Sequence, residues 1–121
     1  MKTKDLTGHA LDYAVAKICK LSPYLHQKNV AYDSLHHHGR IYFRPSTDWS
    51  QGGPIIEREQ IALNLLFNQA PERLWMASAT GGSHSPSVVQ YGPTPLIAAM
   101  RCYVASKLGD EVDIPKELME N

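Results

Sequence analysis

The chain contains few cysteines. Cys19 and Cys102 are the two cysteines among its 121 residues, and they lie far apart in the sequence. A disulfide framework or a structural zinc site needs several ligands at defined, closer spacings. We therefore expect two reduced thiols within helices, no metal site and no cofactor.

Long apolar runs and an excess of charge of either sign are also missing. No run approaches the roughly 20 apolar residues that a membrane-spanning helix requires. The opening MKTKDLTGHALDY lacks the apolar segment of a secretory signal. Lys plus Arg and Asp plus Glu number 12 each, so no overall basic field attracts nucleic acid. These absences predict a cytosolic protein that does not associate with a membrane and has no overall attraction for nucleic acid, with a local basic patch left open.

The composition predicts one domain over residues 1–121. Apolar residues make up 43% of the chain and charged residues 20%, as in ordinary soluble proteins. A chain of this length can bury a core of its own but is too short for two domains.

The most strongly marked element is a helix over Pro95–Leu108. Thr94 can cap its N-terminus, and proline suits the first helical position. Gly109 can supply the left-handed residue that ends the helix. Apolar and small residues leave almost no face suited to water, which predicts a core helix with Arg101 at the edge of its apolar stripe.

The other elements are marked less strongly. A helical pattern covers residues 6–20, and a polar connection with Lys28 and Asn29 follows. Residues 40–44 alternate as a short strand. Residues 55–67 fit either a helix or a strand, although the turn-like NQAPER and the following LWMASA favour a strand pair. Residues 80–95 are rich in Gly, Ser and Pro and predict a long surface loop.

Together these elements predict an α+β domain. Two terminal helices pack on a small, mainly antiparallel central sheet in this arrangement.

Three segments carry a family resemblance. They are LTGHALDYAVA, STDWSQGGPIIERE and GPTPLIAAMRCYVASKLGDEVDIP, about half of the chain. They resemble the small NinX-like proteins of tailed phages and prophages of enteric bacteria. The residues that carry the pattern are Leu11, Asp12, Ser46, Thr47, Asp48, Trp49, Gly53, Pro54, Trp75, Pro95, Ala99, Arg101 and Gly109. The resemblance implies a phage accessory protein in the bacterial cytoplasm, without an established activity.

The irregular polar segment at residues 46–54, which ends in the turn Gly52-Gly53-Pro54, and the start of the last helix form the main candidate site. Hydroxyls, a carboxylate and an indole in an irregular segment can fix a polar ligand, and a helix N-terminus attracts an anion. The predicted ligand-binding residues are Ser46, Thr47, Asp48, Trp49, Gly53, Thr94 and Arg101. The alternative is local structure, in which Asp48 caps a turn, Trp49 packs on the core edge and Arg101 pairs with Asp12 or Asp48.

Three other groups of residues have weaker functional interpretations. His36, His37 and His38 indicate an exposed polar loop rather than a metal site, because adjacent side chains point in different directions. Arg40, Tyr42 and Arg44 share a strand face that could hold a phosphate or stack a base, although a solvated face is commoner. Residues 83–85, Ser-His-Ser, lack the flanking motif of a nucleophile and its base.

We expect a non-enzymatic binding protein that captures a small anionic, nucleotide-like ligand. Self-association as a homo-oligomer would bury surplus apolar surface of so small a domain. The alternative is a protein–protein adaptor or inhibitor of a host protein, with Tyr24, Tyr32 and Tyr42 on its surface. Catalysis has the least support, because the sequence contains no paired carboxylates, nucleotide fingerprint or metal triad, and no catalytic residue is assigned.

Overall fold

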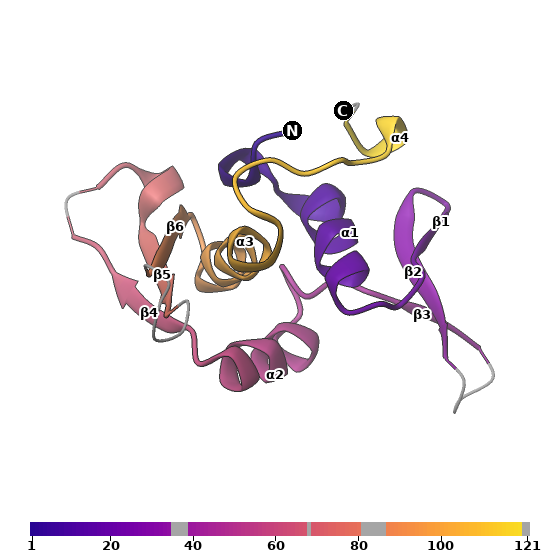
Figure 1. Cartoon of the computed structure of the whole chain (residues 1–121), viewed down its shortest axis with the longest axis horizontal. Helices are drawn as coiled ribbons and strands as arrows, with labels where there is room; N and C mark the ends of the chain where they lie inside the picture. Colours follow the sequence, from indigo (N-terminus) through magenta and orange to yellow (C-terminus); the bar gives the residue numbers. More distant parts are fainter. Residues whose placement is uncertain (35–38, 68, 81–86, 120–121) are drawn as a thin grey trace.

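Helix α3 (Pro95–Leu108) is the centre of the fold (Figure 1). The computed structural model describes residues 1–34, 39–67, 69–80 and 87–119. In this part of the chain α3 contacts α1 (Gly8–Ile18), α2 (Trp49–Glu59) and a three-stranded sheet. The α+β class and the antiparallel strand pairing are confirmed, and the strands form two three-stranded sheets.

The bounds of α3 agree with the prediction. The Thr94 hydroxyl accepts a hydrogen bond of 3.1 Å from the Ile97 amide, and Gly109 follows the helix with a φ of +86°. Seven of its residues are buried: Leu96, Ala98, Ala99, Met100, Cys102, Tyr103 and Val104. The small side chains among them allow neighbouring elements to approach closely.

The first sheet contains a hairpin where a polar connection was expected. Its strands are β1 (Tyr24–His26), β2 (Asn29–Ser34) and β3 (Gly39–Tyr42), all antiparallel in the order β1-β2-β3. Gln27 and Lys28 form the turn between β1 and β2 with φ of 50° and 67°. Because neither residue is the Gly or Asn that usually marks such a turn, the sequence pattern concealed the hairpin.

Helix α2 replaces most of the irregular segment expected at residues 46–54. Asp48 caps it by accepting a 2.9 Å hydrogen bond from the Ser50 amide, and Gln60 ends it with a φ of 54°. Gly52 lies where a Cβ would collide with the Pro45 carbonyl oxygen and with Leu96. The helix therefore forms because its cap and its close contact with α3 outweigh the poor helix propensity of Gly and Pro.

The ambiguous stretch at residues 55–67 is divided between a helix and a strand. Its first five residues complete α2, and β4 (Ala62–Leu65) follows. As expected, β4 pairs antiparallel with β5 (Trp75–Ala79). The loop predicted at residues 80–95 is wrong at β6 (Val88–Gly92), which is the third strand of this sheet. Residues 81–86 lie outside the described part of the chain.

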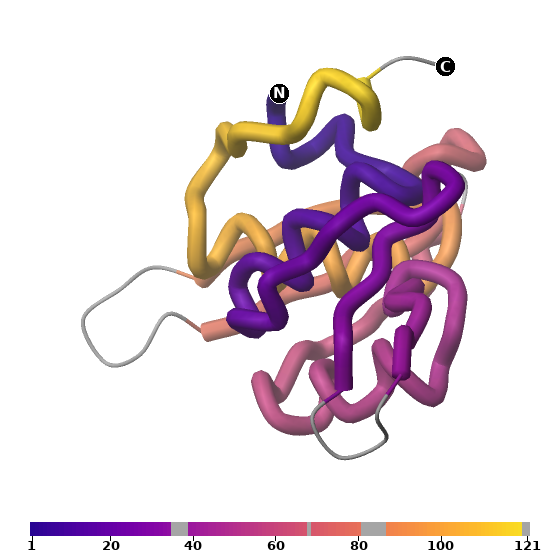
Figure 2. The backbone as a smooth tube through the Cα atoms, turned by 90° about the vertical axis from the view of Figure 1, so that its right-hand side faces the viewer, coloured from indigo at the N-terminus to yellow at the C-terminus, as the bar shows by residue number. Residues whose placement is uncertain are grey.

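The two ends of the described chain lie side by side (Figures 1 and 2). The Met1 ammonium donates to the Val112 carbonyl at 3.0 Å, and the Val112 amide donates to the Met1 carbonyl at 2.9 Å. The buried Thr3 hydroxyl donates to the Gly109 carbonyl at 2.6 Å. These contacts fasten the segment after α3 to the first residues.

The side chain of Gln51 joins α2 to the end of β3. Its Nε2 donates to the Tyr42 carbonyl at 2.8 Å, and its Oε1 accepts from the Arg44 amide at 2.6 Å. We expect Gln51→Ala to lower the free energy of unfolding by about 1–2 kcal/mol, because both backbone groups lose a partner. Urea unfolding followed by tryptophan fluorescence measures this loss. Glu57→Ala, on the exposed side of α2, is the control and should change stability by less than about 0.5 kcal/mol.

Candidate functional site: two pockets beside helix α3

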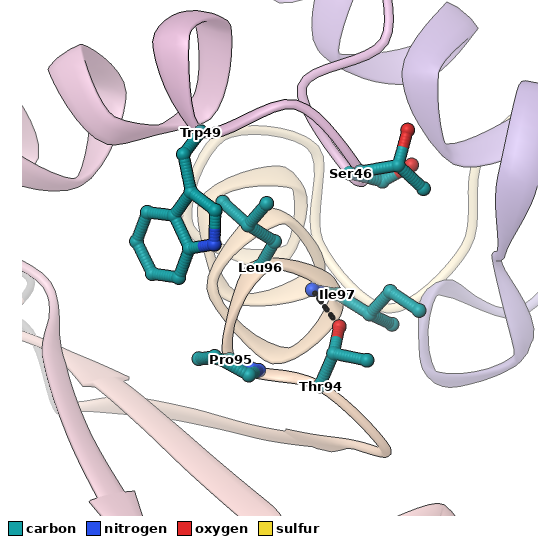
Figure 3. Close-up of a pocket in the computed structure, with 7 residues that line it drawn as sticks. Ser46, Trp49, Thr94, Pro95, Leu96 and Ile97 are labelled. Atoms are coloured by element: carbon teal, nitrogen blue, oxygen red, sulfur yellow. Dashed lines mark hydrogen bonds between the residues drawn. The ribbon is translucent and has the colours of Figure 1, made fainter.

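A small pocket lies between the first turns of α2 and α3 (Figure 3). This Trp49 pocket has a volume of about 230 Å³, and its lining residues are Ser46, Thr47, Trp49, Thr94, Pro95, Leu96 and Ile97. In Figure 3 the Trp49 indole stands beside Leu96, with Pro95 and Thr94 at the start of α3. The indole is 54% exposed. About half of the Trp49 surface is therefore open to solvent, and the rest packs at the edge of the core beside Leu96.

Four of the predicted ligand-binding residues line the Trp49 pocket, and three do not. Ser46, Thr47, Trp49 and Thr94 come together there. The Asp48 carboxylate instead accepts hydrogen bonds from the hydroxyl and amide of Ser50, which lower its pKa. Gly53 lies in α2 outside the pocket lining, and Arg101 lines a different pocket.

The start of α3 presents few backbone amide donors to an anion in this pocket. The Ile97 amide is taken by the Thr94 hydroxyl, and the Ala98 amide donates to the Thr94 carbonyl at 3.0 Å. Pro95 has no amide hydrogen, so Leu96 carries the free N–H of this turn. Apolar walls and an exposed indole suit an apolar side chain better than an anion.

A buried carboxyl group holds the loop that leads to this pocket. Asp12 of α1 is 2% exposed, and its Oδ1 accepts a 2.9 Å hydrogen bond from the Ser46 amide. Burial raises its pKa to about 6, against the opposing effect of Ser46 and weaker attractions from His9 and Arg44. The Ser46 hydroxyl attracts the carboxylate but lacks the geometry of a hydrogen bond. Asp12 therefore positions the loop and does not pair with Arg101.

The larger pocket surrounds Arg101. This Arg101 pocket has a volume of about 530 Å³, and its lining residues are Lys4, Asp5, Glu72, Arg73, Tyr91 and Arg101. They come from the 3-10 turn η1 (Thr3–Asp5), the 3-10 turn η2 (Pro71–Arg73), β6 and α3. Three are cationic and two are acidic, so a positive charge remains.

Arg101 is held by backbone carbonyls rather than by an acid. Its Nε donates to the Leu6 carbonyl at 2.7 Å, and its Nη1 donates to the Tyr91 carbonyl at 2.8 Å. Burial lowers the pKa of its guanidinium, and a weaker attraction from Asp5 opposes this. The ion pairs among the described residues are Arg58–Glu59 and Lys107–Glu59. The expected ion pair of Arg101 with Asp12 or Asp48 is therefore wrong.

A second arginine covers an aromatic ring on the pocket wall. The Arg73 guanidinium lies 4.2 Å from the centre of the Tyr91 ring, within the range of a cation–π interaction. The exposed Arg73 comes from η2, whereas the partly buried Tyr91 comes from β6. Sequence reasoning missed Lys4, Arg73 and Tyr91, because no periodic pattern or motif links three such distant residues.

Comparison with known proteins now assigns the family. A family model described as Bacteriophage P22, NinX matches residues 2–107. The chain belongs to the NinX family. A comparison with curated proteins gives no match. The resemblance seen in the sequence is confirmed, and the matched region of this NinX chain includes every residue that lines the two pockets.

Two other candidate sites of this NinX-family chain lie outside the residues that the structure describes. His36, His37 and His38 and the Ser-His-Ser run at residues 83–85 lie outside the described residues. Among those described, no three His, Cys, Asp or Glu side chains gather to hold a metal. Both cysteines are free, and burial raises the pKa of the Cys102 thiol to about 11. No helix in the described ranges is long and apolar enough to cross a membrane.

Proposed function

We propose that this phage accessory protein captures a small anionic, nucleotide-like molecule in the Arg101 pocket. The observation that carries the proposal is the half-buried Arg101 guanidinium, which has two carbonyl partners and no carboxylate within ion-pair distance in the described chain. Removing a cation from water is costly unless an anion compensates it. A bound anion would supply the missing charge.

The size and shape of the pocket support the same ligand class. Its volume of about 530 Å³ lies within the range of about 300–1,000 Å³ typical of small-molecule sites. Lys4 and Arg73 add two cationic groups around Arg101. The Tyr91 ring with its Arg73 neighbour offers a planar surface on which an aromatic base can stack.

The acidic residues of the pocket restrict the ligand. Asp5 and Glu72 can accept hydrogen bonds from amino or hydroxyl groups, and they repel additional negative charge. A monoanionic or dianionic nucleotide therefore fits the pocket better than a polyanion. Arg101 would hold the phosphate, while Tyr91 would contact the base.

Binding can be measured without knowing the natural ligand. We expect a nucleoside monophosphate to raise the unfolding temperature more than inorganic phosphate does, because the base adds stacking on Tyr91. Arg73→Gln should weaken nucleotide binding by about 10- to 100-fold, the loss expected for a charged hydrogen bond. Native mass spectrometry of protein purified gently from bacterial cytosol would report a retained ligand mass directly.

The controls separate the pocket from general charge and from misfolding. Lys116→Gln removes an exposed cation of helix α4 (Lys116–Met119) and should leave binding unchanged. Arg73 is exposed, and among the described residues it has no ion pair, so its replacement should not unfold the protein. Equal affinity of the Arg73→Gln and Lys116→Gln proteins for the nucleotide would exclude the Arg101 pocket as the site.

A second candidate function is docking of a host protein at Trp49. The adaptor surface predicted from Tyr24, Tyr32 and Tyr42 is not one surface, because Tyr32 packs edge-on against the buried Phe43. The exposed Trp49 beside an apolar pocket is a better anchor, since exposed tryptophans are enriched at protein interfaces. A host protein recovered with the native chain but not with Trp49→Ala would favour this function.

A further inference from the structure

The first sheet has one face against the core and one face turned outward. Leu25, Val30 and Tyr32 belong to the inner face and pack with the core. The register places Tyr24, Ala31 and Tyr42 in one row across the three strands and sets Asp33 opposite Arg40. In Figure 1 this sheet forms the right-hand side of the molecule, with α1 on its inner side.

The outer face carries three aromatic rings from two different strands. His26 and Tyr42 have ring centres 5.9 Å apart, and a 2.8 Å hydrogen bond joins His26 Nδ1 to the Tyr42 hydroxyl. Tyr24 is fixed by donating a 2.6 Å hydrogen bond to Asp33. These contacts engage the polar edges of the rings, and all three residues are partly exposed.

Two arginines border the rings. The Arg44 guanidinium lies 6.0 Å from the centre of the Tyr42 ring. Arg40 is exposed and adjacent to the hydroxyls of Tyr24 and Tyr42, which raise the pKa of its guanidinium. In the described part of the chain neither arginine is within ion-pair distance of a carboxylate. Asp33 and Arg40 balance each other in the register of this face, so its surplus positive charge comes from Arg44, which follows β3 and also attracts Asp12 and Asp48.

We infer that this outer face binds a single strand of nucleic acid, with bases stacked on Tyr24, His26 and Tyr42 and phosphates held by Arg40 and Arg44. Partly exposed aromatic rings can stack with unpaired bases, whereas the bases of a duplex are already stacked on one another. The arginines supply the charge that complements the sugar–phosphate backbone. Although the whole chain is neutral, Arg40 and Arg44 give this face two cationic groups against the single carboxylate of Asp33.

Fluorescence anisotropy with labelled oligothymidylate, oligouridylate and a duplex of equal length tests the inference. Both single strands should bind more tightly than the duplex, and a preference for oligouridylate would identify RNA contacts through the 2′-hydroxyl. Tyr42→Ala should weaken binding about 5- to 150-fold, the loss expected for one stacked base. Arg40→Gln and Arg44→Gln should each reduce the slope of log Kd against log salt concentration by about 0.7, the contribution of one phosphate contact to a single strand.

Matched variants separate stacking from loss of folding. Tyr42→Phe keeps the ring and removes its hydrogen bond to His26, so binding should persist. Phe67→Ala removes an aromatic side chain that is 78% exposed outside this sheet, and Arg73→Gln removes an exposed cation of the Arg101 pocket. Neither should change binding.

Three results would overturn the inference. The first is absence of binding to either single strand at low salt. The second is binding that Tyr42→Ala and Phe67→Ala change equally, and the third is equal affinity for the duplex. The small-anion function proposed above is independent of these results, because Arg73→Gln alters the Arg101 pocket and leaves this face intact.

Discussion

Alanine at Gly52 is expected to destabilise the fold by about 1–3 kcal/mol, whereas alanine at the adjacent Gly53 should stabilise it by about 0.5–1 kcal/mol. A Cβ at Gly52 would collide with the Pro45 carbonyl oxygen and approach Leu96 Cδ2 to 2.7 Å. A Cβ at Gly53 would have no neighbour within 4 Å. Both glycines lie in α2, so helix propensity alone would stabilise both variants equally.

Urea unfolding of the two variants measures this difference in sign. Because the replacements are identical and neighbouring, each protein serves as the control for the other. Stabilisation by Gly52→Ala would mean that α2 does not approach Pro45 closely in solution. Unchanged ligand affinity of Gly53→Ala would also remove Gly53 from the predicted ligand-binding residues.

Asp12 should make the protein less stable as pH rises from about 4 to about 6. Burial raises the pKa of the folded carboxyl to about 6 from 3.8. Within this window the unfolded chain has released the proton while the folded chain retains it, so folding binds a proton and loses stability with increasing pH. A difference of about two between the folded and unfolded pKa values lowers the free energy of unfolding by about 3 kcal/mol once the pH exceeds 6.

Asp12→Asn isolates this contribution. Asparagine keeps an oxygen that can accept the hydrogen bond from the Ser46 amide, but it does not ionise. As pH rises from low to neutral, the free energy of unfolding of the variant should increase by about 3 kcal/mol relative to that of wild type. Unfolding at each pH measures this difference. Asp113→Asn, at an exposed position, is the control. Parallel pH profiles of wild type and Asp12→Asn would show that Asp12 is not desolvated.

The sequence predicted the elements in which the local capping residues and the apolar pattern both indicate the same structure. Thr94, Pro95 and Gly109 mark the ends of α3 by backbone chemistry alone, and the helix forms there. The prediction failed at α2, where Gly52 and Gly53 indicate a turn but contact with α3 favours a helix. It also failed at the hairpin of β1 and β2, whose turn residues Gln27 and Lys28 carry no turn signature.

The candidate sites were predictable only in part, because pockets depend on contacts between distant segments. Ser46, Thr47 and Trp49 are neighbours in sequence, and the fold keeps them together with Thr94. Arg101 was expected beside them, yet it turns toward the Leu6 and Tyr91 carbonyls. No spacing rule in one sequence relates residues 4, 73 and 101, so the larger pocket became visible only with the fold.

The pairing of residues 1–3 with residues 109–112 also has a kinetic consequence. Contacts of such sequence separation are slow to form, because most of the chain must be ordered or looped to bring their ends together. During synthesis the Thr3 hydroxyl cannot donate its hydrogen bond to Gly109 until Gly109 has left the ribosome. The hydrogen bonds between Met1 and Val112 likewise form only after Val112 has emerged. Closure is thus a late event, and until then the amino-terminal segment is open to proteases.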